Sequence, residues 1–327
     1  MKAEDNLFQR EAEKFAALDL PWEKLRGKAI AITGATGLIG GSLLRYLRAA
    51  NEIRALDLRL IPLCRKPDRL PGAVFYDALG ELPEFEADYI IHAASNAHPL
   101  AFSSDPVGTM QANLLGTMRL LERIRERGGR LVFCSTGEIY GENPALDSFD
   151  EAAFGAIDPM RARSCYPESK RAGETLCAAY HAQYGVDALA ARLCYVYGPG
   201  ITPENSRADA QFLRKARSGE DIVLKSPGSQ VRSYCYVFDA ASALLTLMLR
   251  GEAGQAYNVS GSTASIREYA ETLAALAGVS LRFELPPDAE KQGYSAVTRA
   301  VLDSGKLQAL GWKAEYGLEE GLKRTLG

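Results

Sequence analysis

The chain has 327 residues, of which 47% are hydrophobic and 24% are charged, and its formal net charge is -3. This length and balance suit a globular domain with a smaller second lobe and a sizeable apolar core. Charges of both signs are interspersed and do not form the clustered basic face of a nucleic-acid-binding protein, so we expect no nucleic-acid partner.

Residues 1–27 precede the first strong strand signal. Leu7, Phe8, Phe15 and Ala16 could share one face of a helix. We expect an N-terminal helical extension that packs on the body of the protein, with a partner-binding arm as the alternative.

Cysteine spacing and hydropathy indicate in which cellular compartment the protein is expected. The six cysteines include no CxxC pair and no His/Cys spacing that fits zinc, so we expect no metal site. The first residues lack the apolar core of a signal peptide, and no apolar run approaches the length of a membrane span. The expectation is a reduced cytoplasmic protein without a membrane partner.

Short apolar runs alternate with helical stretches from residue 28 onward. The predicted strands lie at 29–33, 59–64, 89–93, 130–134 and 187–193, and the predicted helices between them near 38–50, 107–127 and 167–184. Strands that are apolar on both faces and separated by helices are typical of a parallel sheet covered on both sides. We therefore predict an α/β fold with a Rossmann-like doubly wound parallel sheet.

A second lobe is expected after residue 198, where loops rich in Pro and Gly alternate with short elements. Helices are predicted there at 209–218, 238–250, 265–277 and 304–310. We assign 28–198 to the dinucleotide-binding domain, with 237–259 returning to it, and 199–236 and 260–327 to a smaller substrate-binding lobe.

A glycine-rich turn, TGATGLIG, follows the first predicted strand at 33–40 and opens the first predicted helix. Glycines allow the backbone to approach a pyrophosphate closely, and the helix start offers free N–H groups to that anion. The sequence therefore predicts dinucleotide binding. The expected cofactor contacts are Gly34, Thr36, Gly37, Leu38, Ile39 and Gly40.

The second predicted strand ends in Arg65 and Lys66, where NAD-binding proteins usually carry an acid for the ribose 2′-hydroxyl. Two cations there could accept the 2′-phosphate of NADP. The alternative is a solvated basic loop. We include both residues among the expected cofactor contacts and leave NAD and NADP open.

Tyr166 and Lys170 are four residues apart, so on a helix they share one face. A lysine ammonium close to a phenol favours the phenolate, which can act as an acid or base. Ser135 and Thr136 end the preceding strand, where ligands bind in open parallel sheets. Their hydroxyls could bond a reacting carbonyl or alcohol, although such residues also cap turns.

The order of these motifs resembles that of the extended short-chain dehydrogenase/reductases, and more narrowly the nucleotide-sugar epimerase/dehydratase family. The resemblance covers residues 28–327 and includes TGATGLIG, IIHAAS (90–95), NLLGT (113–117), STGEIYG (135–141), YPESK (166–170) and RLCYVYGPG (192–200). The segments from Arg163 to Leu176 and from Gly228 to Tyr234 are most similar to UDP-glucuronate decarboxylases. NAD, a nucleotide-sugar substrate and a homodimer paired through the helices near 107–127 and 167–184 are what the resemblance implies.

The resemblance also implies roles for individual residues. Thr136 stands at the position of the catalytic Ser/Thr, with Ser135 as the weaker candidate. Tyr166 would take the proton of a C4 hydroxyl while hydride leaves to the nicotinamide, and Lys170 would hold the nicotinamide ribose. Arg232 would grip the nucleotide diphosphate, with a surface salt bridge as its alternative role. The other implied contacts are Asp77, Ala93, Ala94 and Asn113 for the cofactor and Ser95 for the substrate.

Glu138 is expected to act at C5, because family dehydratases and decarboxylases carry a glutamate at this place. A hydrogen bond that only holds a neighbouring side chain in place is the plainer alternative. Gly137 replaces the aspartate that protonates the leaving hydroxyl in dTDP-glucose dehydratases, which disfavours dehydration. Decarboxylation needs no such acid, since the 4-ketone itself stabilises the enolate.

One departure from the family pattern and two competing functions remain. The family arginine ahead of Asp303 and Lys306 is missing, with Gly293 and Tyr294 in its place and Lys291 as the nearest cation. The competing functions are an NAD(P)H-dependent oxidoreductase of a smaller alcohol or ketone, and a non-catalytic dinucleotide-binding regulator. The diphosphate-binding arginine argues against the first, and the intact Thr, Tyr and Lys set argues against the second.

Overall fold

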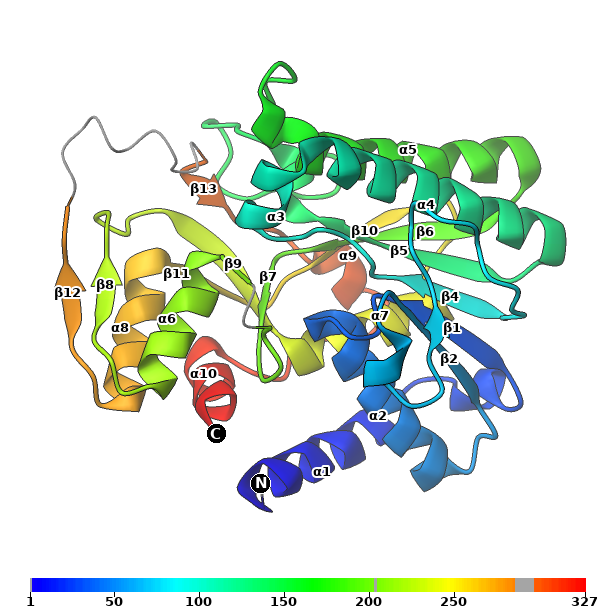
Figure 1. Cartoon of the computed structure of the whole chain (residues 1–327), viewed down its shortest axis with the longest axis horizontal. Coiled ribbons are helices and arrows are strands. Elements are labelled where there is room, and N and C mark those ends of the chain that lie inside the picture. Colours follow the sequence, from blue (N-terminus) through cyan, green and yellow to red (C-terminus); the bar gives the residue numbers. More distant parts are fainter. Residues whose placement is uncertain (1, 203–204, 286–296) are drawn as a thin grey trace.

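The computed structural model describes residues 2–202, 205–285 and 297–327, which form two lobes that lie side by side (Figure 1). The larger lobe contains an extended sheet between helices. The smaller lobe contains short strands and helices from the second half of the chain.

A parallel sheet of seven strands forms the centre of the larger lobe. Its strands are β1 (Ala29–Thr33), β2 (Arg59–Cys64), β3 (Val74–Phe75), β4 (Tyr89–His92), β5 (Arg130–Thr136), β6 (Asp187–Leu193) and β10 (Ala256–Val259). They lie in the order β10-β6-β5-β4-β1-β2-β3, and every neighbouring pair is parallel. The predicted Rossmann-like doubly wound parallel sheet is confirmed.

Helices cover both faces of this sheet. They are α2 (Leu38–Arg54) and α7 (Val237–Arg250) on one face, and α4 (Pro106–Arg127) and α5 (Cys165–Tyr184) on the other. Side chains alternate along β1, so Ile30 and Ile32 join the core that contains α2 and α7. Ala29 and Ala31 join the core that contains α4 and α5. A strand buried on both faces explains the continuous apolar run in the sequence.

Among the described residues, the smaller lobe contains two small sheets with helices packed on them. One sheet joins β7 (Tyr195–Tyr197), β9 (Val231–Tyr236), β11 (Ser262–Ser265) and β13 (Arg299–Ala300), and the other joins β8 (Ile222–Leu224) and β12 (Leu281–Phe283). Its helices are α6 (Ala208–Arg217), α8 (Ile266–Ala277) and α10 (Leu318–Leu326), whereas the short helix α9 (Gly305–Gln308) packs on β10 of the larger lobe. β7 follows β6 directly in the chain, so the two lobes are joined there by a very short connection.

The N-terminal residues form α1 (Lys2–Ala16), which packs on the larger lobe (Figure 1). The ring of Phe15 is stacked on Tyr46 of α2 at 5.1 Å between centroids. It also meets Phe238 of α7 edge-on at 6.0 Å. These aromatic contacts bury the apolar face that the sequence pattern indicated.

Element boundaries differ from the predictions mainly at two places. β5 continues beyond residue 134 through Ser135 and Thr136, because both residues pair with β6. Helix α9 is shorter than the predicted 304–310. The small helix α3 (Pro99–Ser104) lies between β4 and α4 and was not predicted.

Candidate active site

The glycine turn after β1 forms a close backbone cradle. Gly34 has a φ of +68°, and a Cβ there would lie 2.9 Å from the carbonyl oxygen of Ala93. A Cβ at Gly40 would lie 2.5 Å from the oxygen of Gly34, so α2 can approach the turn only without that atom. Since α2 begins at Leu38, its first N–H groups are next to the turn. This geometry fits a pyrophosphate held by the residues expected from the sequence.

The end of β4 lies beside this cradle and is tied to both helices on that face. The amide of Ala94 donates to Thr33 Oγ1 at 3.1 Å. Ser95 Oγ donates to Asn113 Oδ1 at 2.8 Å. Asn113 is fully buried, and its Nδ2 donates to Ser169 Oγ of α5 at 2.8 Å. Asn113 therefore links the end of β4, α4 and α5.

Tyr166, Lys170 and Thr136 are brought together where β5 ends and α5 begins. Tyr166 lies in the first turn of α5, one turn ahead of Lys170, and has a side-chain hydrogen bond with Thr136. Lys170 Nζ is buried and donates to the carbonyl oxygen of Cys134 at 2.7 Å. Phe102 of α3 stacks on the Tyr166 ring at 5.3 Å between centroids. The phenol is thus fixed between the strand end and α3.

Burial controls the titration of this pair. Burial raises the pKa of Tyr166 above its ordinary value, the Glu138 carboxylate raises it further, and the hydrogen bond with Thr136 lowers it. Burial lowers the pKa of Lys170 to about 8. We expected Lys170 to lower the tyrosine pKa. Instead, the loss of hydration around a buried phenolate outweighs nearby positive charge, and the net shift of the Tyr166 pKa is upward.

Glu138 lies next to this pair and forms an ion pair with Arg163. Arg163 Nη2 is 2.9 Å from Glu138 Oε2, with about half of the arginine side chain exposed. The Arg163 guanidinium also lies 4.1 Å from the centroid of the Phe102 ring. Both charges act on Tyr166, since Glu138 raises its pKa and Arg163 lowers it. Arg163 begins the segment that is most similar to UDP-glucuronate decarboxylases, but no role was predicted for it from the sequence.

Ser135 lies elsewhere than the other predicted catalytic residues. Its hydroxyl donates to Glu174 Oε1 at 2.5 Å. Glu174 in turn pairs with Arg192 at 2.8 Å, and both charged side chains are largely buried. Because neighbouring strand residues point to opposite faces, Thr136 and Ser135 cannot both face Tyr166. The structure therefore assigns the position beside Tyr166 to Thr136 and puts Ser135 in a separate buried network.

Arg232 of β9 is buried beneath the ring of Tyr195. Only 3% of its surface is exposed, and its guanidinium carbon is 5.8 Å from the Tyr195 ring centroid. Its N–H groups donate to the carbonyl oxygens of Val231 at 2.9 Å and Val297 at 2.6 Å, and to Gln230 Oε1 at 3.1 Å. Neutral oxygens hold this cation, so its charge is not cancelled by those contacts.

Arg207 is a second arginine that the sequence reading missed. Its guanidinium carbon is 5.9 Å from the centroid of the same Tyr195 ring, and it is one of the charges that lower the pKa of Tyr166. Arg207 pairs with Asp209 at 2.9 Å. Its buried Nε has no hydrogen-bond partner among the described residues. A single arginine after a Pro/Gly-rich loop carries no spacing signal, which is why only the fold reveals it.

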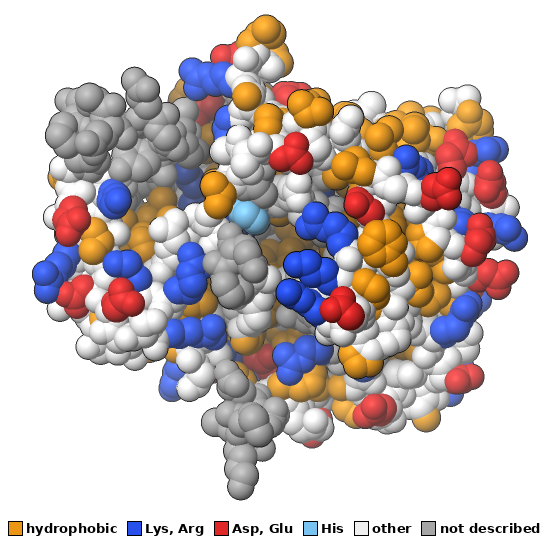
Figure 2. Space-filling view, viewed as in Figure 1, with side chains coloured by type: hydrophobic (Ala, Val, Ile, Leu, Met, Phe, Trp, Pro, Cys, Tyr) orange, Lys and Arg blue, Asp and Glu red, His pale blue; other side chains and the backbone are white. Residues whose placement is uncertain are grey.

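Lys and Arg side chains gather around a hollow near the middle of the face shown in Figure 2. Arg65 and Lys66, directly after β2, are both exposed. Asp77 follows β3, and its Oδ1 accepts the amide of Leu79 at 3.0 Å. The structure thus places an exposed pair of cations, and no acid, at the end of β2.

Three further predictions concern the residues ahead of Asp303, metal sites and membrane-spanning helices. Lys291, Gly293 and Tyr294 lie outside the described residues. Across 2–202, 205–285 and 297–327, no group of three or more His, Cys, Asp or Glu side chains could hold a metal ion. In the same part of the chain, no helix combines the length and the apolar character that crossing a membrane requires.

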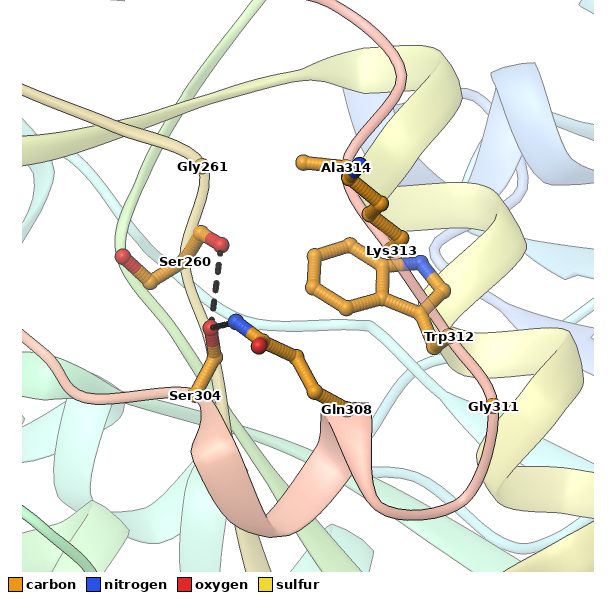
Figure 3. A pocket seen from close by; sticks show the side chains of 8 residues that line it. All are labelled: Ser260, Gly261, Ser304, Gln308, Gly311, Trp312, Lys313 and Ala314. Atoms are coloured by element: carbon orange, nitrogen blue, oxygen red, sulfur yellow. Dashed lines mark hydrogen bonds between the residues drawn. The ribbon is translucent and has the colours of Figure 1, made fainter.

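A pocket of about 490 Å³ lies between the β10–β11 connection, α9 and the segment before α10 (Figure 3). The ring of Trp312 faces Ser304 and Gln308 across it. Gln308 Nε2 donates to Ser304 Oγ at 3.0 Å, and Ser304 Oγ donates to the carbonyl oxygen of Ser260 at 3.4 Å. None of the predicted site residues lines this pocket.

Comparisons with known proteins agree with this geometry. The model of the NAD dependent epimerase/dehydratase family matches residues 30–260. The chain is 33% identical over 302 residues to UDP-glucuronic acid decarboxylase 5 of Arabidopsis thaliana, which covers 90% of this chain and 86% of that protein. It is similar to the NAD complex of UDP-glucose 4-epimerase from Thermus thermophilus, with a TM-score of 0.77, 30% identity and coverage of 91% and 97%. A dTDP-glucose 4,6-dehydratase from Streptomyces venezuelae gives a TM-score of 0.75, 26% identity and coverage of 91% and 95%.

Proposed function

The chain belongs to the NAD-dependent epimerase/dehydratase family, and on this basis we propose that it oxidises C4 of a nucleotide-activated sugar and then decarboxylates it. The proposed substrate is a nucleotide-linked uronic acid such as UDP-glucuronate. The observation that carries the proposal is the position of Glu138 beside the Thr136–Tyr166 pair, which gives one site two groups that can move protons at neighbouring carbons.

The first step is oxidation at C4. Tyr166 removes the proton of the C4 hydroxyl, and Thr136 holds the same oxygen through its own hydroxyl. Bound NAD supplies the hydride acceptor. Lys170 contributes a cation at the base of the site, where its buried ammonium is fixed by the Cys134 carbonyl. The start of α5 adds the positive end of its dipole close to the phenolate.

The second step is loss of carbon dioxide from the 4-keto sugar. The bond between C5 and the C6 carboxylate breaks, and its electron pair moves toward the C4 ketone to give an enolate. Glu138 is then placed to deliver a proton to C5. Tyr166 gives its proton back to the C4 oxygen as hydride returns to C4 from the reduced cofactor, so that the only net loss is carbon dioxide. Gly137 has no acidic side chain, and its Cβ would lie 3.0 Å from Leu302, so no acid is available there to expel a hydroxyl as water. This absence favours decarboxylation over dehydration.

Recognition of the diphosphate is assigned to Arg207 and Arg232, which both lie close to the ring of Tyr195. Arg232 is buried with neutral partners, and Arg207 has an unpaired Nε, so both retain donors for an anion. The named relatives act on uridine or thymidine diphosphate sugars by their titles, which supports a nucleotide-sugar substrate here. A small uncharged alcohol would leave the charge of Arg232 without an anionic partner.

We also propose a homodimer and a cytoplasmic location. The exposed faces of α4 and α5 carry Val107, Met110, Met118 and Tyr184. Hydrophobic side chains gather over this part of the surface in Figure 2. All six cysteines are free thiols, as expected in a reducing compartment.

The test is incubation of the purified protein with UDP-glucuronate, UDP- and dTDP-hexoses and GDP-mannose, followed by mass spectrometry of the products. Loss of carbon dioxide from UDP-glucuronate is the expected result. Loss of water would identify a dehydratase, and a new sugar configuration at unchanged mass an epimerase. No reaction with any of them, with cofactor bound, would favour a smaller alcohol or ketone as substrate.

A further inference from the structure

The adenosine end of the cofactor site is formed by loops that follow β2 and β3. β2 lies between β1 and β3 in the sheet, and the amide of Ala35 in the glycine turn donates to the carbonyl oxygen of Leu63 at 3.3 Å. Arg65 therefore begins two residues beyond the strand position that is bonded to the phosphate cradle. In this fold, that strand end is where the ribose 2′ position of a dinucleotide is recognised.

Arg65 and Lys66 are both exposed, and neither side chain has a hydrogen bond or ion pair with any described residue. This differs from most cations of the larger lobe close by. Arg48 is bonded to the Pro71 carbonyl, and Arg59 to that of Glu86. Two adjacent cations without partners at a recognition position are available for an anionic ligand group.

The acids in this region do not replace the missing carboxylate. Asp77 follows β3, not β2, and its side chain caps a turn by accepting the Leu79 amide. Asp68 comes three residues after Arg65, in the short helical turn Pro67–Arg69. A diol recognised through its 2′-hydroxyl needs an acceptor, whereas the two side chains directly after β2, Arg65 and Lys66, are both donors.

We propose that Arg65 and Lys66 bind the 2′-phosphate of NADP, so that this chain binds NADP more tightly than NAD. A phosphate monoester carries close to two negative charges, which match two cations with several N–H donors. NAD still fits the pyrophosphate cradle and the rest of the site, because the 2′-phosphate lies outside them. The inference deepens the cofactor half of the proposed function and is independent of which sugar is bound.

The experiment measures binding of NADP and NAD by calorimetry to protein freed of co-purified nucleotide, with 2′,5′-ADP and 5′-AMP as fragments. The wild type should bind NADP at least about tenfold more tightly than NAD, and 2′,5′-ADP more tightly than 5′-AMP by a similar factor. The Arg65→Ala/Lys66→Ala variant should lose both differences while its affinity for NAD stays within about twofold. Arg65→Asp should shift the preference toward NAD.

Arg69→Ala is the matched control, because Arg69 is also exposed and unbonded and lies four residues away. It should keep the NADP preference. Equal affinity of the wild type for NADP and NAD would overturn the inference, and so would a double variant that retains the preference. An equal loss of the NADP preference in the Arg69→Ala variant would also overturn the inference. It would show that positive charge in this region attracts the phosphate without a specific site. None of these binding results depends on turnover of a sugar. Failure of the cofactor inference can therefore be distinguished from failure of the proposed reaction.

Discussion

Tyr166 is held in an environment that favours the protonated phenol. Burial raises its pKa, and Glu138 acts in the same direction. The hydrogen bond with Thr136 lowers the Tyr166 pKa and so favours the phenolate that acts as the base. General acid–base groups of this kind contribute about 10²–10⁴-fold to rate.

Replacing Tyr166 with Phe should lower turnover by about 10²–10⁴-fold and leave cofactor affinity within about twofold, because only the hydroxyl is removed. Single-turnover kinetics with the product assay and a separate cofactor titration measure the two effects. Tyr184→Phe is the control, since Tyr184 is half exposed at the far end of the same helix. Turnover retained by Tyr166→Phe would contradict the assigned role.

Lys170 should give the reaction an alkaline limit. Burial lowers its pKa from 10.5 to about 8, so the ammonium is present below pH 8 and is lost as pH rises through that value. We expect kcat/KM to fall above about pH 8. Lys170→Arg, whose guanidinium stays protonated, should be slower but should lack this alkaline fall. A profile that stays flat to pH 10 in the wild type would exclude an essential ammonium at this position.

The site residues differ in how far sequence could reach them. Tyr166 and Lys170 follow from helical spacing, and Gly34 and Gly40 from a strand–turn–helix context. Ser135 and Thr136 are adjacent hydroxyls, and only the folded structure shows that Thr136 bonds the tyrosine whereas Ser135 bonds Glu174. Arg207 comes to the site through the packing of α6 against the rest of its lobe, and no local pattern encodes that.

At the level of helices and strands, the long elements were predictable and the short ones were not. β1 and β2 are continuous apolar runs because helices cover both faces of the sheet. β3 is only Val74–Phe75, and its pairing with Leu63 and Cys64 makes it a strand. α3 spans six residues, which is too short for a helical period to be recognised.

The helix α1 is joined to three other elements by one buried carboxylate. Glu11 is 2% exposed and accepts hydrogen bonds from Tyr46 of α2 at 2.6 Å and Tyr236 of β9 at 2.9 Å. Arg324 of α10 is 3.4 Å away. The sequence predicted the apolar face of this helix, but a single glutamate gives no sign that it is buried.

Glu11→Ala should lower the free energy of unfolding by about 3 kcal/mol, because two buried hydroxyls and a cation lose their acceptor together. Urea denaturation followed by circular dichroism measures the change. Glu13→Ala on the exposed side of the same helix is the control and should change stability by no more than about 0.5 kcal/mol. Equal effects of the two substitutions would mean that the Glu11 contacts do not stabilise the fold.

For the whole molecule, α4 and α5 form the outer helical layer of one sheet face and lie next to each other (Figure 1). Val107 is 65% exposed, and Met110 and Met118 are 38% and 39% exposed along α4. These residues form an apolar strip along α4, and Tyr184 adds to it at the end of α5. The strip would be buried if a second copy packed its own pair of helices there. The strip leaves the hollow between the two lobes free for ligands.

Size-exclusion chromatography with light scattering should therefore show a dimer for the wild type and a monomer for Met118→Lys, because a charge in the middle of the strip would be buried without a partner. Ile53→Lys is the control, since Ile53 is 51% exposed but lies on α2, on the opposite face of the sheet. It should remain dimeric.

Both variants should retain cofactor binding if the dimer only stabilises the protein. Weaker cofactor binding by Met118→Lys alone would mean that the partner copy supports α5 and, through it, the position of Tyr166. A monomeric wild type would rule out the interface.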